Sequence, residues 1–419
     1  MQNRQQIHAN INHWLTAILL FALPLYKKAT PIIVILLLLN WLAEGRFRAR
    51  FTTLFTNKGI YRFVFALLIL FYIMHVAALL YTDNSKAGLF ELEKKLSFLV
   101  LPLIFFPVSN SGFSRTQLKQ LLLSYLAGTL AISLFCLTQS LIRFAQTGDS
   151  SVMYYVNFTQ FEHPTYYAMY MITALILVVG VLITEWKNLK SILRIAAVAL
   201  VPYYILIIML ANSRAAIIAM TLVAILTIVY FIIRTKKYTI GLILLLALCA
   251  GFPAGRYLMP HVYDRFLFGL DEVFAARKME DIKHWNGTTL RVQVYYCDAE
   301  LIKENFWAGV SPGDVCDELA GKYSKYGFRH ALERNYNAHN QFLQTFIGLG
   351  IAGFLVLLLI VLIPFIYAAR KNDYVLMAFT LMVSVLFMFE SMLQLQAGIM
   401  FIAAGISLLT IRNRKTIIE

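Results

Sequence analysis

Long apolar runs, separated by short polar connections, follow one another along nearly the whole chain. A helix needs about 20 apolar residues to cross about 30 Å of hydrocarbon, and most of these runs approach or reach that length. The pattern therefore predicts about twelve transmembrane helices, although the first two runs are short enough to form a re-entrant hairpin instead. The runs occupy 11–26, 30–44, 61–81, 96–108, 119–144, 165–184, 194–211, 214–233, 239–256, 340–368, 374–392 and 396–411.

The composition agrees with a membrane protein. Of the 419 residues, 60% are hydrophobic and only 14% are charged, whereas soluble domains are about 45–50% apolar and about 25% charged. This excludes a soluble enzyme, a disordered chain and a coiled coil. The net charge of +15 does not indicate nucleic-acid binding, because the basic residues lie in short clusters between apolar runs.

The distribution of lysine and arginine predicts the orientation. If the N-terminus is cytoplasmic, nineteen basic residues lie on the inner side and seven in the short outer connections, as the positive-inside rule requires. Both termini are then cytoplasmic. No small-residue cleavage site follows the first apolar run, so we interpret that run as a retained membrane segment and not as a signal peptide.

One long polar segment, 253–338, interrupts the apolar pattern and carries 12 acidic and 11 basic residues. It follows the ninth predicted crossing and therefore faces outward. Leu290, Val294 and Leu301 recur at helical spacing and predict a helix over about 288–305. The predicted organisation is thus helices 1–9 in 1–252, an outer helical loop domain in 253–338, and helices 10–12 in 339–419.

The four cysteines lack the spacing of a metal site, and we expect neither a metal nor another cofactor. Cys136 and Cys249 lie in apolar runs, whereas Cys297 and Cys316 lie in the outer segment. A disulfide between the last two remains open at this point.

Two arginines stand out on the outer side. Arg214 lies in a short turn between two apolar runs, where a charge is costly unless it has a function or reaches the headgroups. Arg291 lies near the start of the predicted outer helix, where helix N–H groups and a guanidinium together favour an anion. The alternative for Arg291 is a salt bridge to Asp298 or Glu300.

His339 lies where the outer segment meets the next apolar run. It is either a structural hydrogen-bonding residue or a base that accepts a proton near neutral pH. His163 and Tyr166, at the start of another outer helix, are candidates for acceptor binding or support. We expect Glu390, at the end of an apolar run, to pair with the following glutamines Gln394 and Gln396.

The segment HNQFLQTFIGLGIAG, from His339 to Gly353, resembles the His-Asn…Gly-x-Gly-x-x-Gly signature of the O-antigen ligase/polymerase superfamily. Asn212–Ala216 is similar to the outer-turn arginine motif of that family, and Arg291 followed by NFWAGVSPGD is similar to its outer-loop motif. Phe306 stands where the family usually has proline, and Ser311 where glycine is common. The resemblance covers about 165–368.

The resemblance implies a GT-C-like membrane glycosyltransferase of the Gram-negative inner membrane, closest to O-antigen ligase. Such an enzyme transfers a glycan from undecaprenyl pyrophosphate to lipid A–core at the periplasmic face, without a cofactor and with inversion. Arg214 and Arg291 would then bind the pyrophosphate, and His339 would act as the base. Asn340 joins His163 and Tyr166 as a supporting candidate.

Two other functions compete with the ligase. An O-antigen polymerase would extend the glycan on its lipid carrier, and one sequence does not identify the acceptor contacts that separate the two. A polysaccharide transporter or flippase would share the apolar pattern, but it should place ionisable residues near the middle of its spans. Here they gather on the outer side. The glycan, the acceptor hydroxyl and the oligomeric state stay open.

Overall fold

The computed structural model describes residues 2–56, 59–107, 113–265, 267 and 289–412. Every predicted apolar run corresponds to a helix, and the described residues contain no strand. The helices built from the apolar runs are α1 (Gln2–Ala22), α2 (Thr30–Glu44), α4 (Ile60–Ala78), α6 (Ser97–Phe105), α7 (Arg115–Thr147), α9 (Pro164–Glu185), α10 (Ser191–Ala211), α11 (Arg214–Thr235), α12 (Tyr238–Leu258), α17 (Gln341–Lys371), α18 (Tyr374–Phe389) and α19 (Gln396–Arg412). Short helices in the connections are α3 (Phe47–Thr56), α5 (Ser85–Lys95), η1 (Ser150–Met153), α8 (Tyr155–Thr159) and η3 (Met392–Gln394).

Six helices in the described part of the chain are long and apolar enough to cross a membrane, namely α4, α7, α9, α10, α11 and α17. Four shorter apolar helices accompany them: α2, the first part of α12, α18 and α19. The chain is therefore an all-helical protein of the polytopic membrane class in its described residues. The number of about twelve crossings and the GT-C-like class both remain predictions.

The first helix is longer than its apolar run predicts, because it begins at Gln2 instead of residue 11. Its polar first turns pack against α2: Arg4 donates to the carbonyl of Ala43 at 2.7 Å, and His8 lies 2.9 Å from the side chain of Asn40. Tertiary contacts therefore extend this helix beyond the part that hydrophobicity reveals.

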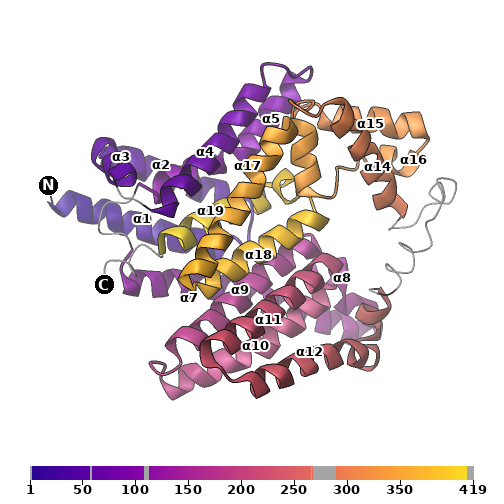
Figure 1. Ribbon diagram of the computed structural model, residues 1–419. Coiled ribbons are helices and arrows are strands. Elements are labelled where there is room, and N and C mark those ends of the chain that lie inside the picture. Colours follow the sequence, from indigo (N-terminus) through magenta and orange to yellow (C-terminus); the bar gives the residue numbers. More distant parts are fainter. Residues whose placement is uncertain (1, 57–58, 108–112, 266, 268–288, 413–419) are drawn as a thin grey trace.

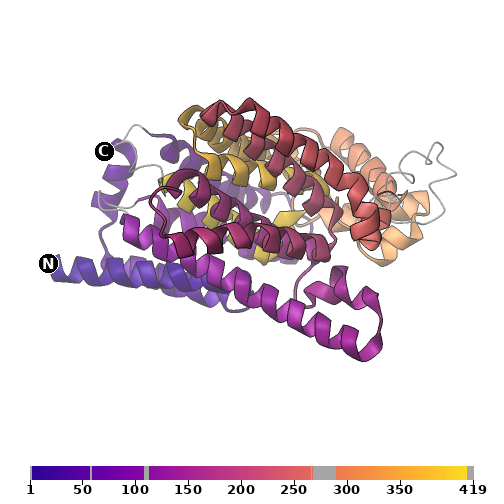
Figure 2. The same ribbon diagram turned by 90° about the horizontal axis from the view of Figure 1, so that it is seen from below.

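The helices pack into one body with a continuous apolar core. Within it α9 packs against α10, α17 packs against α4 and α18, and α11 packs against α18. Figures 1 and 2 show that α1 begins at the end of the body opposite to the outer segment 289–333.

The outer segment forms a small helical unit with a core of its own. It consists of α14 (Thr289–Glu304), α15 (Val315–Tyr326) and α16 (Arg329–Glu333), and residues 268–288 of the predicted domain lie outside the described residues. Val294, Leu301 and Tyr323 are among its buried side chains, so the predicted amphipathic helix is confirmed. Cys297 and Cys316 are both free, and the disulfide that the sequence left open is absent.

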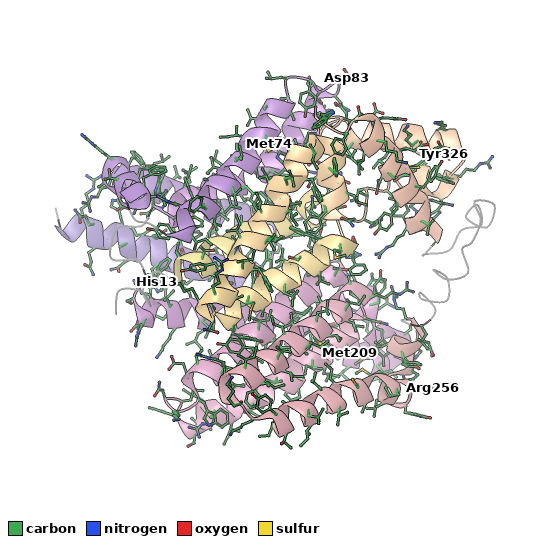
Figure 3. All side chains as sticks on the ribbon, viewed as in Figure 1. His13, Met74, Asp83, Met209, Arg256 and Tyr326 are labelled. Atoms are coloured by element: carbon green, nitrogen blue, oxygen red, sulfur yellow. The ribbon has the colours of Figure 1, made fainter. Side chains whose placement is uncertain are left out.

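A polar contact joins this unit to the loop that follows α4. Asp83 of that loop is labelled in Figure 3. The carboxylate of Asp314 accepts hydrogen bonds from the Thr82 hydroxyl at 3.0 Å and from the backbone N–H groups of Asp83 and Asn84 at 3.1 and 2.7 Å. Three hydrogen bonds to one side chain connect the two parts firmly. It fixes where the outer unit stands on the body.

Candidate functional site

His339 and Glu390 form a hydrogen-bonded pair at the outer ends of two neighbouring helices. His339 precedes α17, and Glu390 directly follows α18. The imidazole Nδ1 lies 3.3 Å from Oε2 of Glu390, with 21% and 14% of the two side chains exposed. When Nδ1–H donates to the carboxylate, Nε2 is left as the acceptor of the ring. This corrects the expectation that Glu390 pairs with Gln394 and Gln396.

Local hydrogen bonds hold His339 in an unusual backbone conformation, with φ of +45°. A non-glycine residue at positive φ is strained and persists only when its surroundings hold it there. The side chain of Asn337 accepts from the His339 N–H at 3.0 Å. Asn340 caps α17 by accepting from the N–H groups of Phe342 and Leu343 at 2.9 and 3.1 Å. Asn340 therefore supports the site through the backbone.

The electrostatics of Glu390 connect several predicted residues. Burial raises the pKa of this carboxyl, but the hydrogen bond from His339 and the positive charges of His339, His163 and Arg291 outweigh it, and the pKa lies below its ordinary value. Glu390 is therefore ionised at neutral pH. Its carboxylate lies within electrostatic range of both histidines and of Arg291.

Arg291 lies near the start of α14 and donates to the carbonyl of Phe389 at 3.3 Å. Its guanidinium therefore lies next to the residue that precedes Glu390. The alternative salt bridges do not form: Glu300 pairs with Lys322, and neither carboxylate oxygen of Asp298 has a hydrogen-bond partner. The structure thus brings Arg291 and His339 to the same place.

His163 and Tyr166 lie at the start of α9, beside the same carboxylate. Desolvation lowers the pKa of His163, while the charge of Glu390 opposes the change. Tyr166 is buried and its hydroxyl donates to the carbonyl of Met392 at 3.4 Å. Tyr166 therefore holds the segment that follows Glu390, whereas His163 is a partly desolvated residue at the surface.

Arg214 is the first residue of α11, and Ser213 caps this helix. α11 runs antiparallel to α18, because Tyr230 near the end of α11 donates to the carbonyl of Asn372 just before α18. At 1.5 Å per residue, Arg214 and Glu390 lie roughly 24 and 27 Å from that contact, at the same end of the body. The Ser213 and Thr165 hydroxyls, 2.9 Å apart, join α11 to α9 there.

A third arginine, which the sequence analysis did not single out, accompanies Arg214. The Arg214 Nε donates to the carbonyl of Arg265 at 2.9 Å. The guanidinium of Arg265 stacks on the ring of Tyr155, with 3.6 Å between its Cζ and the ring centre, and its buried Nε has no hydrogen-bond partner. Its charge also acts on His163.

A signal in the sequence could have identified one of the two missed residues, but not the other. Glu390 ends an apolar run on the same predicted side as His339, which already makes the two potential partners. Arg265 lies in the outer segment, but its partner Tyr155 is more than a hundred residues earlier. Only the folded arrangement reveals that stacking.

No cluster of three or more histidine, cysteine, aspartate or glutamate side chains suited to a metal ion occurs in the described ranges. The candidate site is instead cationic: Arg291 lies beside the His339–Glu390 pair, and Arg214 and Arg265 lie at the same end of the body. Such a site suits an anionic ligand and a proton transfer at the imidazole.

Comparison with known proteins identifies a related family. No curated protein matches the chain. Residues 195–358, which contain Arg214, Arg265, Arg291 and His339, match the family model described as O-antigen ligase, and this match confirms the resemblance to the O-antigen ligase superfamily.

Proposed function

We propose that the protein is an O-antigen ligase, which transfers a glycan from undecaprenyl pyrophosphate to lipid A–core at the periplasmic face of the inner membrane. One observation carries the proposal: the His339–Glu390 pair and the cations Arg214 and Arg291 meet at one end of the helical body. A base beside an anion-binding group is what transfer from a glycosyl pyrophosphate requires.

The chemistry follows from these side chains. The acceptor hydroxyl attacks the anomeric carbon of the glycan and gives its proton to Nε2 of His339, while Glu390 stabilises the imidazolium. The bond from the anomeric carbon to the pyrophosphate oxygen breaks on the opposite face, so the anomeric configuration inverts. The pyrophosphate leaves with a growing negative charge, which preorganised guanidiniums stabilise.

Arginine suits this leaving group because its planar fork binds phosphate oxygens bidentately and remains charged at all relevant pH values. In the described ranges Arg291 donates to a backbone carbonyl, and Arg265 stacks on an aromatic ring. Their charge is therefore available for a substrate anion. The stacking on Tyr155 orients the Arg265 guanidinium in advance, and we add Arg265 to the proposed pyrophosphate site.

The test uses purified protein, a lipid-linked glycan and lipid A–core. Wild-type protein should form glycosylated lipid A–core in the presence of EDTA, and a strict requirement for Mg²⁺ would contradict the arginine mechanism. His339→Ala should lower the rate by about 10²–10⁴-fold, and Arg214→Ala and Arg291→Ala should abolish transfer. The exposed Arg329 of α16 supplies the control Arg329→Ala, which should keep full activity.

The same assay separates the alternatives. Longer lipid-linked glycan without glycosylated lipid A–core would identify a polymerase. Movement of the lipid-linked glycan across vesicle membranes without any new glycosidic bond would identify a flippase. Either result would overturn the ligase proposal.

A further inference from the structure

The helix that follows His339 is broken, and the outer loop fills the break. Gly350 has φ of +63° and ψ of −166° inside α17. The loop that follows α14 forms backbone hydrogen bonds with α17 on both sides of Gly350. The Val310 N–H donates to the Ile347 carbonyl at 2.8 Å, and the Ile351 N–H donates to the Phe306 carbonyl at 2.9 Å. The loop after α14 is therefore built into α17.

The position of Gly350 along α17 gives the depth of this joint. About twenty residues separate Gly350 from Arg370 and Lys371, the basic residues at the inner end of α17. At 1.5 Å per residue, these twenty residues of helix span roughly 30 Å, which is the thickness of the hydrocarbon core. Gly350 therefore lies at the outer boundary of the hydrocarbon.

An independent helix gives the same boundary. α4 begins at Ile60, beside Arg62, and twenty residues later the chain reaches Leu80, again roughly 30 Å away. Tyr81 then donates from its hydroxyl to the carbonyl of Ala308 at 2.8 Å. The apolar parts of the antiparallel helices α4 and α17 thus end at the same depth. The hydrogen bond from Tyr81 to Ala308 places the loop after α14 at this depth as well.

Large apolar side chains are exposed there. The exposed fractions are 90% for Leu80, 80% for Trp307 and 40% for Phe306. The surface continues along the membrane helices through exposed Val76 on α4 and Leu355 on α17. Because these two belong to the lipid-facing sides of apolar helices, the same lipid layer is the natural cover for Leu80 and Trp307.

We propose that Trp307 and Leu80 insert into the outer leaflet of the bilayer and anchor the outer loop to it. Tryptophan is favoured at this depth, since its ring is apolar and its indole N–H reaches the polar headgroup layer. The anchor holds residues 306–311 in the break of α17. It thereby fixes α14, which carries Arg291, relative to the start of α17, which His339 precedes.

Fluorescence tests this proposal without any activity measurement. The full chain is reconstituted in vesicles of phosphatidylethanolamine and phosphatidylglycerol, with and without bromine atoms on the acyl chains near the headgroups. The difference in emission between wild type and Trp307→Phe isolates Trp307, and the exchange of one aromatic ring for another preserves the fold. Trp41→Phe is the matched control, because Trp41 is only 9% exposed and packs on Phe47.

We expect brominated lipid to remove the Trp307 emission and aqueous iodide to leave it unchanged, while the Trp41 emission resists both quenchers. Quenching of Trp307 by iodide would place it in water and overturn the proposal. Resistance to both quenchers would mean that protein covers Trp307, for example a second copy of the chain, and would overturn it as well.

Discussion

At the scale of single residues, the pairing of His339 with Glu390 gives the sharpest prediction. Because Glu390 is ionised at neutral pH, it orients the imidazole and stabilises the charge that proton uptake creates. We expect Glu390→Gln to lower kcat by about tenfold or more, with little change in KM for the lipid-linked glycan. Steady-state kinetics with the purified protein measure kcat and KM separately.

The matched control is Glu162→Gln. Glu162 lies on the same outer side and pairs with Lys27 at 3.3 Å, but it makes no contact with His339. Its loss should leave kcat unchanged. Equal kcat values for Glu390→Gln and wild type would reject the role of Glu390.

Asp298 allows a second prediction at this scale. Burial raises the pKa of this carboxyl well above its ordinary value, and neither oxygen has a partner. The folded protein therefore binds the proton more tightly than the unfolded chain, so stability falls as pH rises above about 4. Each pKa unit of the difference costs about 1.4 kcal/mol.

Asp298→Asn keeps the shape of the side chain and removes its charge. We expect its melting temperature to match that of wild type near pH 4 and to exceed it increasingly toward about pH 8. Asp264→Asn, at an exposed carboxylate, should show no such trend. A pH-independent difference for Asp298→Asn would contradict the buried, protonated carboxyl.

At the scale of secondary-structure elements, the break in α17 depends on a missing side chain. A Cβ atom at Gly350 would lie 2.2 Å from the carbonyl oxygen of Trp307, and the positive φ disfavours any L side chain. We expect Gly350→Ala to lower stability by about 1–3 kcal/mol and to reduce transfer, because the loop leaves the helix and Arg291 moves with it. Thermal unfolding and the transfer assay measure the two effects.

Gly321 offers the opposite case within α15. A Cβ atom there would meet nothing within 4 Å, and alanine is favoured over glycine in a helix by about 1 kcal/mol. Gly321→Ala should therefore stabilise the outer unit and keep activity. Equal stability and equal transfer activity for the two alanine variants would show that the break at Gly350 does not depend on the missing side chain.

Hydrophobic periodicity predicted the helices well, since each apolar run corresponds to a helix and α14 covers 289–304 where 288–305 was expected. It could not predict the break at Gly350, because glycine in an apolar run is also compatible with close helix packing. The cause of the break is a loop about forty residues earlier in the chain. Ser311 shows the same limit: it takes a glycine-like φ of +79° where its N–H donates to the Gly348 carbonyl of α17 at 3.1 Å.

The candidate site was predictable in part for a related reason. Position along the chain predicted Arg214 and His339 at the outer ends of apolar runs, and Arg291 near the start of the predicted outer helix. The partner of each depends on which helices are neighbours, and that is a tertiary property. Glu390 and Arg265 were therefore missed or misassigned, although their residue types alone suit the chemistry.

At the scale of the whole molecule, the proposed orientation depends on the distribution of basic residues and on the common end shared by the site and the outer helices. The native cysteines allow a test without new reporter groups. Cys316, in the outer unit, is exposed and free, whereas Cys136 and Cys297 are buried. Cys249 is exposed on α12, within an apolar stretch where lipid excludes a charged reagent.

A membrane-impermeant maleimide added to cells with an intact inner membrane should therefore label Cys316 alone, and Cys316→Ser should abolish the label. Burial raises the pKa of the Cys316 thiol, and because the thiolate is the reacting form, labelling should be slow and should accelerate as pH rises. Labelling only after the inner membrane is opened would reverse the proposed orientation and place the site in the cytoplasm. Labelling only after reduction would instead show that Cys316 is oxidised in the cell.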